Sequence, residues 1–282
     1  MFVLKIGGAA GLDHEALCQD IAALWRSGAQ LVIVHGGSAD TDALAQQLNH
    51  APRTIVTPSG HHSRYTDRQT LEIFAMATAR LNRLLVERLQ QLDVPAFGMS
   101  GVDGRLLQAR RKATLRSVED GRVRIIRDDW TGSVTGVNKV LLRTLLTAGY
   151  LPIIAPLAIS DGGEMVNVDG DRAAAAIAGA LQAETLVLLS NVAGLMRNFP
   201  DPTTVVAQLS QAELAAAGEW AQGRMKKKLM GAQEALSAGV GTVVIGDGRR
   251  ATPLQDALAG HGTTISAAGV QQPALAAVEA HA

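Results

Sequence analysis

The chain has 282 residues, 47% hydrophobic and 18% charged, so it can bury a large core as one domain or two lobes. Lysine plus arginine and aspartate plus glutamate each number 26, which excludes a whole-protein attraction to nucleic acid or membrane. Cys18 is the only cysteine, which excludes an internal disulfide and a cysteine-based zinc site, and its apolar neighbours predict a buried helix position. No apolar run approaches a membrane span and a strand begins the chain, so we expect a cytoplasmic protein.

Apolar runs and amphipathic stretches alternate along almost the whole chain. Buried strands are expected at Phe2–Ile6, Gln30–His35, Val94–Gly98, Leu151–Ala155, Leu186–Ser190 and Thr242–Ile245. Helices are expected at Asp13–Ser27, Asp40–Leu48, Asp67–Leu92, Gly136–Ala148, Asp171–Leu181 and Gly223–Ala238. Strands separated by helices imply parallel pairing with right-handed crossovers. The sequence therefore predicts an α/β fold, a three-layer αβα sandwich around a mainly parallel sheet.

Residues 104–131 interrupt this alternation. They contain short extended stretches and a turn at Glu119-Asp120-Gly121, which predicts a β-hairpin protruding from the sandwich. Thr66 and Gln69 have the spacing of a capping box at the start of a helix. Residues 267–282 are alanine-rich without a clear partner face, and we expect a disordered tail there. No linker or repeat divides the rest, so a single domain is expected over residues 1–266.

Paired glycines follow each of the first two predicted strands. Lys5 lies at the end of the first strand, directly before Gly7 and Gly8, where a lysine is expected to meet an anion. The second strand ends at His35 and leads through Gly36-Gly37-Ser38 into a helix N-terminus, with Ser38 as a candidate cap. Each turn alone is equally compatible with an ordinary strand end. In a parallel sheet, however, both turns lie at the carboxyl edge, where ligands bind. We expect His35 to be packed or hydrogen-bonded rather than a base.

Two stretches could hold a substrate. The guanidinium of Arg64 could grip a carboxylate through two parallel hydrogen bonds, although surface arginines are common. Asn167, Asp169 and Asp171 precede an alanine-rich helix, where the simplest interpretation of the aspartates is capping and interaction with the helix dipole. The functional alternative is that Asn167 binds a substrate while an aspartate orients lysines or a metal.

The lysine run at residues 226–228 has a helical geometry. Met225, Leu229, Ala232 and Leu236 form an apolar stripe with spacings of four, three and four residues. Lys228 points with this stripe, toward the protein interior, and calls for an anion. Lys226 and Lys227 are predicted to be solvated. A further stretch, residues 190–195, follows a buried strand with small residues that leave space for a flat ring or a phosphate.

Eight basic residues gather in the interrupted region: Arg105, Arg110, Arg111, Lys112, Arg116, Arg122, Arg124 and Arg127. Only Glu119 and Asp120 oppose them in this stretch. The simplest interpretation is a solubilising loop. The alternative is a docking face for an acidic partner, because clustered charge raises encounter rates and fixes orientation. Nucleic acid is a weaker candidate, since the stretch has no aromatic residue for stacking.

Together these residues resemble the amino acid kinase family, in its acetylglutamate kinase-like branch. The matching stretches are Lys5-Ile-Gly-Gly8, His35-Gly-Gly-Ser38, Arg64-Tyr-Thr-Asp67, Asn167-Val-Asp-Gly-Asp171, Ser190-Asn-Val-Ala-Gly194 and Met225-Lys-Lys-Lys228. They occur in family order to about Thr264. The resemblance implies transfer of the ATP γ-phosphoryl group to a side-chain carboxylate, which gives an acyl phosphate.

Within that branch the chain is similar to the kinases of lysine biosynthesis whose substrate, L-2-aminoadipate, is attached to a small acidic carrier protein. The similar stretches are Thr66–Phe74, Ser100–Arg105 with Arg110-Arg-Lys112, and Gly223–Gly231. The basic cluster suits such a partner, and the docking residues are expected to be Arg110, Arg111, Lys112, Arg116, Arg122 and Arg124. Carrier-bound glutamate is a second candidate substrate.

The resemblance also implies a role for each matching residue. Lys5 and Lys228 would stabilise the transferring phosphoryl group, and Asp171 would orient both lysines. The acceptor would be held by Gly36, Gly37, Ser38, Arg64 and Asn167. The nucleotide would be bound by Gly7, Gly8, Ser190, Asn191, Val192, Ala193, Gly194, Leu195, Met196, Gly223, Arg224 and Met225. ATP is the expected phosphoryl donor, with Mg²⁺ held mainly by phosphates and water rather than by protein ligands. Residues up to about 170 would form an acceptor lobe and residues 171–266 a nucleotide lobe.

Two positions depart from acetylglutamate kinases, which usually have glycine where this chain has Ser38 and often asparagine where it has Asp169. Both departures lie near the expected substrate, so they put a small acetylated substrate in doubt more than the reaction. N-acetylglutamate kinase of arginine biosynthesis is the first alternative, and a non-catalytic amino-acid or nucleotide sensor on the same fold is another. A homodimer is expected from the way relatives pair.

Overall fold

A computed structural model describes residues 1–57, 62–112, 114–119 and 122–267 of the chain. Its central sheet has the strand order β14-β16-β15-β13-β1-β2-β10-β5. These strands are β1 (Phe2–Ile6), β2 (Leu31–His35), β5 (Ala96–Ser100), β10 (Leu151–Ala155), β13 (Thr185–Ser190), β14 (Gln208–Ser210), β15 (Thr242–Asp247) and β16 (Thr263–Ser266). Pairing is parallel from β15 to β5, whereas β16 runs antiparallel to β15. The predicted mainly parallel sheet is confirmed.

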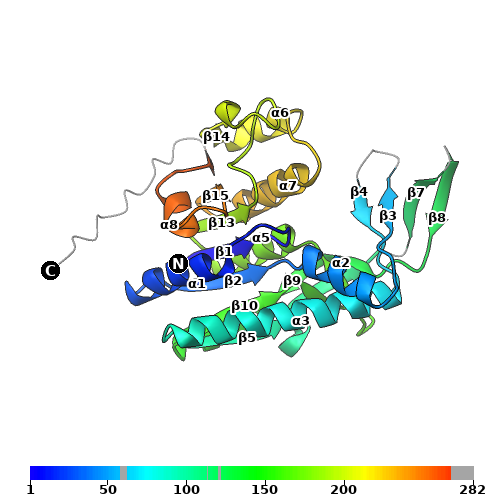
Figure 1. Cartoon of the computed structure of the whole chain (residues 1–282), viewed down its shortest axis with the longest axis horizontal. Helices are drawn as coiled ribbons and strands as arrows, with labels where there is room; N and C mark the ends of the chain where they lie inside the picture. The colour runs from blue at the N-terminus through cyan, green and yellow to red at the C-terminus, as the bar shows by residue number, and fades with distance from the viewer. Residues whose placement is uncertain (58–61, 113, 120–121, 268–282) are drawn as a thin grey trace.

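Helices cover both faces of this sheet (Figure 1). One apolar cluster joins α1 (His14–Arg26), α3 (Arg68–Gln91) and α8 (Pro253–Leu258) to the sheet, and a second joins α4 (Lys139–Thr147), α5 (Gly170–Leu181) and α7 (Arg224–Ser237) to its other face. The remaining helices are α2 (Ser38–Gln47), the short α6 (Leu214–Ala217) and the 3₁₀ turns Asp103–Arg105, Pro202–Thr204 and Gln211–Glu213. The three-layer sandwich is therefore confirmed.

Alternation along β1 decides which layer each side chain meets. Leu4 and Ile6 pack with α1 and α3, whereas Val3 packs with α5 and α7. Because successive side chains of a strand point to opposite faces, Lys5 shares the face of Val3. The first strand thus carries its lysine toward the N-termini of α5 and α7. Cys18 is buried on α1, as predicted.

Several predicted boundaries are wrong; β5, expected at Val94–Gly98, lies two residues later. The helix expected over Gly136–Ala148 begins only at Lys139, because Asn138 caps it by accepting from Leu141 N at 3.2 Å. The capping box of Thr66 and Gln69 is absent, since the cap of α3 is Asp67, whose Oδ1 accepts from Thr70 N at 2.7 Å. A carboxylate next to the predicted threonine reaches the same free amide group more directly.

The predicted hairpin over residues 104–131 is too broad. A small closed barrel takes up its two ends and consists of β6 (Leu107–Arg111), β9 (Thr131–Val137), β11 (Leu157–Ser160) and β12 (Met165–Val168). Only β7 (Leu115–Glu119) and β8 (Arg122–Ile126) form the protruding hairpin, and its predicted turn at Asp120 and Gly121 lies outside the described residues. A second hairpin, β3 (Thr54–Val56) with β4 (His62–Arg64), stands beside it and was not predicted (Figure 1).

The expected tail at residues 268–282 lies outside the described part of the chain. Within that part, no helix combines the length and apolarity needed to cross a bilayer.

Candidate active site

Lys5 meets a carboxylate at the carboxyl end of β1. Its Nζ lies 2.8 Å from Asp171 Oδ1, and the residue is only 7% exposed. Asp171 is available for this contact because Asp169, not Asp171, caps α5, accepting from the Asp171 and Arg172 amides at 3.0 and 3.2 Å. The capping interpretation is therefore correct for Asp169, and the functional alternative describes Asp171.

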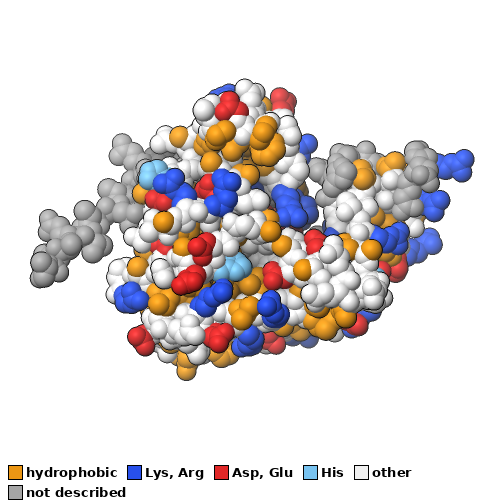
Figure 2. Space-filling view, viewed as in Figure 1, with side chains coloured by type: hydrophobic (Ala, Val, Ile, Leu, Met, Phe, Trp, Pro, Cys, Tyr) orange, Lys and Arg blue, Asp and Glu red, His pale blue; other side chains and the backbone are white. Residues whose placement is uncertain are grey.

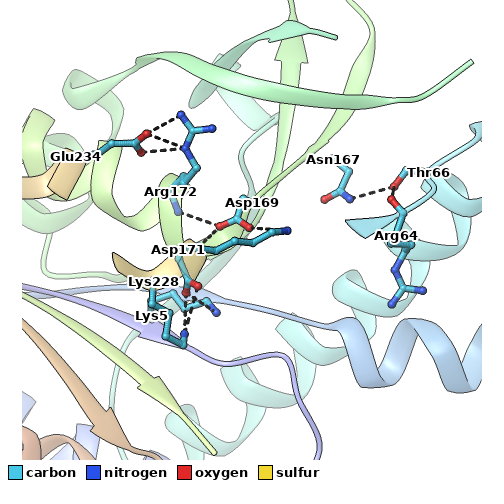
Figure 3. Close-up of polar contacts among 10 residues, drawn as sticks. Lys5, Arg64, Thr66, Asn167, Asp169, Asp171, Arg172, Lys228 and Glu234 are labelled. Carbon is cyan, nitrogen blue, oxygen red and sulfur yellow. Dashed lines mark hydrogen bonds and ion pairs between the residues drawn. The ribbon is translucent and has the colours of Figure 1, made fainter. Parts of the chain in front are cut away.

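Lys228 binds the same carboxylate from α7. Its Nζ donates to Asp171 Oδ1 at 3.1 Å and Oδ2 at 3.3 Å, and Lys228 is 5% exposed (Figure 3). The inward direction predicted from the apolar stripe is confirmed. An ammonium group has three N–H donors, and Asp171 occupies only part of them. The two lysines can therefore offer further donors to an anion beside β1.

The ionisation of this cluster follows from its burial. The pKa of Lys228 is lowered to about 8, because burial and then the charge of Lys5 disfavour its ammonium form more than Asp171 favours it. Burial alone would raise the pKa of Asp171, but the two ammonium groups outweigh it and hold this pKa well below the usual range. At neutral pH the carboxylate is ionised and most Lys228 side chains are protonated, so the cluster has excess positive charge.

A second layer of ion pairs joins α5 to α7 around the cluster. Lys227 Nζ lies 3.4 Å from Asp169 Oδ2, so the prediction that Lys227 is merely solvated is wrong, although the exposed Lys226 fits it. Arg172 Nε donates to both carboxylate oxygens of Glu234, at 2.9 and 3.0 Å (Figure 3). These contacts fix the spacing of the helices that carry Asp171 and Lys228.

The two glycine pairs touch each other at the end of β1 and β2. A Cβ on Gly8 would lie 2.4 Å from Gly37 N, and one on Gly36 would lie 2.5 Å from Gly8 N. Real Cβ atoms do not approach backbone so closely, so this contact requires glycine. Ser38 Oγ donates to Gly8 O at 2.6 Å and Ala39 N donates to it at 2.8 Å. Ser38 thus ties the two turns together and does not cap α2, whose N-cap Gly37 has no side-chain bond.

His35 is hydrogen-bonded to the second glycine turn. It is fully buried, with Nδ1 2.7 Å from Gly36 O and Nε2 3.1 Å from Asn82 Nδ2. A carbonyl only accepts and an amide nitrogen only donates, so Nδ1 carries the proton and Nε2 accepts. Burial lowers the pKa of His35 to about 4, which keeps the ring neutral. The prediction of a hydrogen-bonded, non-basic histidine is confirmed.

Arg64 and Asn167 lie apart from the cluster of Lys5, Lys228 and Asp171 (Figure 3). Arg64 Nη2 donates to Ser38 O at 3.2 Å, and its Nη1 forms an ion pair with Asp42 of α2. Asn167 Nδ2 donates to Thr66 Oγ1 at 3.5 Å. Arg64 therefore lies at the start of α2, and Asn167 is connected to the same region through Thr66. Asp42 and Thr66 were not predicted as site residues. Only for Asp42 did the sequence contain a signal, namely its short distance along the chain from the Gly36-Gly37 turn.

The loop after β13 is held against β16. Leu195 N donates to Thr263 Oγ1 at 2.8 Å, and a Cβ on Gly194 would lie 2.8 Å from the same oxygen. Leu195 and Met196 are buried, so their side chains belong to the core. Ser190 Oγ is buried and has no hydrogen-bond partner among the described residues, and the residue lies beside Gly7 at the sheet edge. Gly223 precedes α7 with a φ of 53°, in the left-handed region that favours glycine.

The predicted basic docking cluster divides into two groups. Arg111 is committed to the fold, because its guanidinium stacks 3.6 Å from the Trp130 ring centre and its Nε donates to Asp129 O at 3.1 Å. Lys112 comes directly after this strand and is itself exposed; partial burial of its ammonium group lowers its pKa while Asp129 raises it. The other four residues, Arg110, Arg116, Arg122 and Arg124, are exposed.

No group of three or more His, Cys, Asp or Glu side chains that could hold a metal ion occurs in the part of the chain that the structure describes. Asp171, the most buried carboxylate of the site, is occupied by two lysines. A divalent cation here would therefore need oxygen ligands from elsewhere, as phosphates and water provide.

Comparison with known proteins shows which family has this sequence and this arrangement of residues. The model of the amino acid kinase family matches residues 1–247. The chain belongs to the amino acid kinase family. It is 50% identical over 267 residues to a "[LysW]-aminoadipate kinase" of Deinococcus radiodurans, covering 94% of this chain and 91% of that protein. The enzyme of the same name from Thermus thermophilus is 48% identical, with 94% and 100% covered. A Cenarchaeum symbiosum protein, 40% identical with 94% and 98% covered, is named a putative "[LysW]-aminoadipate/[LysW]-glutamate kinase". The predicted kinase is confirmed.

Solved structures support the fold. N-acetylglutamate synthase of Neisseria gonorrhoeae matches with a TM-score of 0.76 and 29% identity, over 94% of this chain and 59% of that one. Carbamate kinase of Giardia matches with a TM-score of 0.67 and 17% identity, over 94% and 98%, which is a likeness of fold alone. The sandwich with its parallel sheet is thus the fold of this amino acid kinase.

Proposed function

We propose that this kinase transfers the γ-phosphoryl group of ATP to the side-chain carboxylate of L-2-aminoadipate whose amino group is attached to a small acidic carrier protein. The names of relatives at 48% and 50% identity support the substrate and the carrier. Carrier-bound glutamate is the second substrate of the proposal, because more distant relatives are named for both. The observation that carries the reaction is the convergence of Lys5 and Lys228 on Asp171 beside two glycine turns.

The chemistry needs positioning and charge rather than a protein base. The acceptor carboxylate is already ionised at neutral pH, so no proton has to be removed. Lys5 and Lys228 would stabilise the charge on the phosphoryl group as it passes between oxygens, and Asp171 holds their ammonium groups in place. The amides of Gly8 and Gly37 lie close together where the two turns meet and would donate to the same group. Mg²⁺ bound to the ATP phosphates would neutralise part of their charge.

The two substrates would approach from different sides. Arg64, Asn167 and Ser38 would hold the acceptor, within a lobe formed by residues up to about 170. Residues 190–196 and 223–225 would line the nucleotide site, in a lobe formed by residues 171–266. The closeness of Ser190 to Gly7 supports the nucleotide site, because two of the stretches expected to bind the nucleotide meet there.

The exposed arginines Arg110, Arg116, Arg122 and Arg124 would attract the carrier. Arg111 is excluded from this role by its stacking on Trp130, and it would support the docking surface instead. A cytoplasmic homodimer stays a prediction.

Charge reversal tests the carrier proposal. The triple change Arg110→Glu, Arg116→Glu and Arg122→Glu is expected to raise the KM for carrier-linked aminoadipate about a hundredfold at low salt, because long-range attraction becomes repulsion. A matched control reverses three exposed charges elsewhere: Arg26→Glu, Lys139→Glu and Arg143→Glu. We expect less than about a twofold change for that control. An unchanged KM for the carrier substrate in the first variant would show that these arginines do not dock it.

A further inference from the structure

One face of the protruding hairpin is apolar and exposed. In the β7-β8 ladder Val118 pairs with Val123 and Arg116 pairs with Ile125. Paired residues and every second residue of a strand share a face, so these four side chains form one surface, here named the hairpin ridge. Val123 and Ile125 are each 57% exposed. Two large apolar side chains side by side on a protrusion indicate a contact surface.

The opposite face of the hairpin is covered only at β7, because Arg122 and Arg124 of β8 are exposed there. It carries Ser117, which is 1% exposed, and β7 packs there against β3, whose Ile55 is also buried. The two hairpins therefore support each other through one face of β7-β8 and leave the ridge outward. Figure 2 shows hydrophobic and basic side chains together on this protrusion.

Hydrogen bonds at the base of the two hairpins connect them to the proposed acceptor site. Trp130, just after β8, donates its amide to Thr66 O at 2.7 Å, and Thr66 N donates to Asp129 Oδ1 at 3.3 Å. Thr66 in turn accepts from Asn167 and follows Arg64 at the end of β4. A five-residue strand spans about 17 Å, so a partner on the ridge sits within a short linker's reach of these residues.

We propose that the hairpin ridge, formed by Arg116, Val118, Val123 and Ile125, is the apolar part of the carrier's docking site; this inference rests on the proposed function. The occupant is a protein with an apolar patch bordered by carboxylates. Arg116 of β7 lies within the ridge, and Arg122 and Arg124 are exposed on the opposite face of β8, so the positive charge on and around the ridge favours an acidic partner.

The ridge and the arginines contribute differently to binding. Desolvation of Val123 and Ile125 adds affinity that depends little on salt, whereas arginines on the rim act through screened attraction and mainly change the association rate. Salt dependence therefore separates the two contributions experimentally.

The test is the double substitution Val123→Thr and Ile125→Thr, which removes apolar area but keeps β-branched side chains suited to a strand. Steady-state kinetics with the carrier-linked aminoadipate are measured at several salt concentrations, together with the sedimentation of each protein. We expect a KM about tenfold higher, an unchanged kcat and an unchanged slope of log KM against log salt. The control substitutions Val140→Thr and Met230→Gln alter residues 69% and 48% exposed on other elements and should leave KM unchanged.

Each other outcome overturns the inference. A KM equal to that of the unaltered enzyme means that the carrier does not touch the ridge. Dissociation of an oligomer by the double substitution means that the ridge joins two copies of this chain. If the unaltered enzyme itself does not phosphorylate carrier-linked substrate but does phosphorylate free N-acetylglutamate, the proposed function fails, and this inference fails with it.

Discussion

The side chain of Lys228 illustrates what periodicity can predict at a single residue. Its place next to Leu229, within a stripe of apolar positions, indicated an inward direction, and the residue is buried on Asp171. Lys227 could not be predicted in the same way, because its partner Asp169 is distant in the sequence and meets it only through the packing of α5 on α7. Asn82 was detectable from the sequence, because it is a polar residue between apolar positions of a predicted helix, and it is buried between leucines of α3.

Replacing Lys228 should separate catalysis from stability. Lys228→Met is expected to lower kcat about a thousandfold, because one of two cations at the phosphoryl group is lost. The free energy of unfolding should change little, since burial already disfavours the charge of Lys228 and Asp171 retains its ion pair with Lys5. Steady-state kinetics and thermal unfolding check this, with Lys226→Met as the exposed control. A fall in kcat of less than about tenfold would show that Lys228 does not stabilise the transferring phosphoryl group.

The pH dependence of the free enzyme should follow from the same residue. The pKa of Lys228 is lowered to about 8, so its ammonium loses the proton as pH rises through that value. Because the protonated form binds phosphate, kcat/KM for ATP is expected to fall above about pH 8. In the Lys228→Met variant the residual kcat/KM should not show this alkaline decline. An identical decline in that variant would assign the titration to another group.

At the scale of elements, the glycine turns were predictable but their contact was not. Sequence alone placed both turns at the carboxyl edge, because parallel strands end there. That Gly8 and Gly36 touch depends on the adjacency of β1 and β2 in the sheet. The short strands of the barrel were missed for a related reason. β9 contains glycine and serine, and the partners of β6 lie far along the chain, so local patterns do not reveal them.

Gly8→Ala tests the turn contact. The new Cβ would lie 2.4 Å from Gly37 N, so the backbone must shift, at a cost of about 1–3 kcal/mol in the free energy of unfolding. We expect kcat to fall at least about a hundredfold, because the displaced amides no longer meet the phosphoryl group. Gly162→Ala is the matched control, since its Cβ would have no neighbour closer than 3.6 Å. Equal activity of both variants would contradict the proposed binding of the phosphoryl group by the Gly8 and Gly37 amides.

At the scale of the whole molecule, six of the eight sheet strands were predicted, because parallel strands buried on both faces are nearly continuous apolar runs. The other two, β14 and β16 at one end of the sheet, are short and were missed. The order of the motifs along the chain indicated the family, since each motif ends a strand or begins a helix at the same sheet edge. The carrier could be predicted less directly from the fold, because its proposed site lies on the hairpins rather than on the sheet.

ADP release with three acceptors tests the central claim most directly. Purified enzyme, ATP and Mg²⁺ are combined with carrier-linked L-2-aminoadipate, carrier-linked glutamate or free N-acetylglutamate at equal concentration. The account predicts that kcat/KM for carrier-linked aminoadipate exceeds that for free N-acetylglutamate by at least about a thousandfold, equivalent to about 4 kcal/mol of transition-state binding. A kcat/KM for free N-acetylglutamate equal to or above that of the carrier-linked substrate would contradict it.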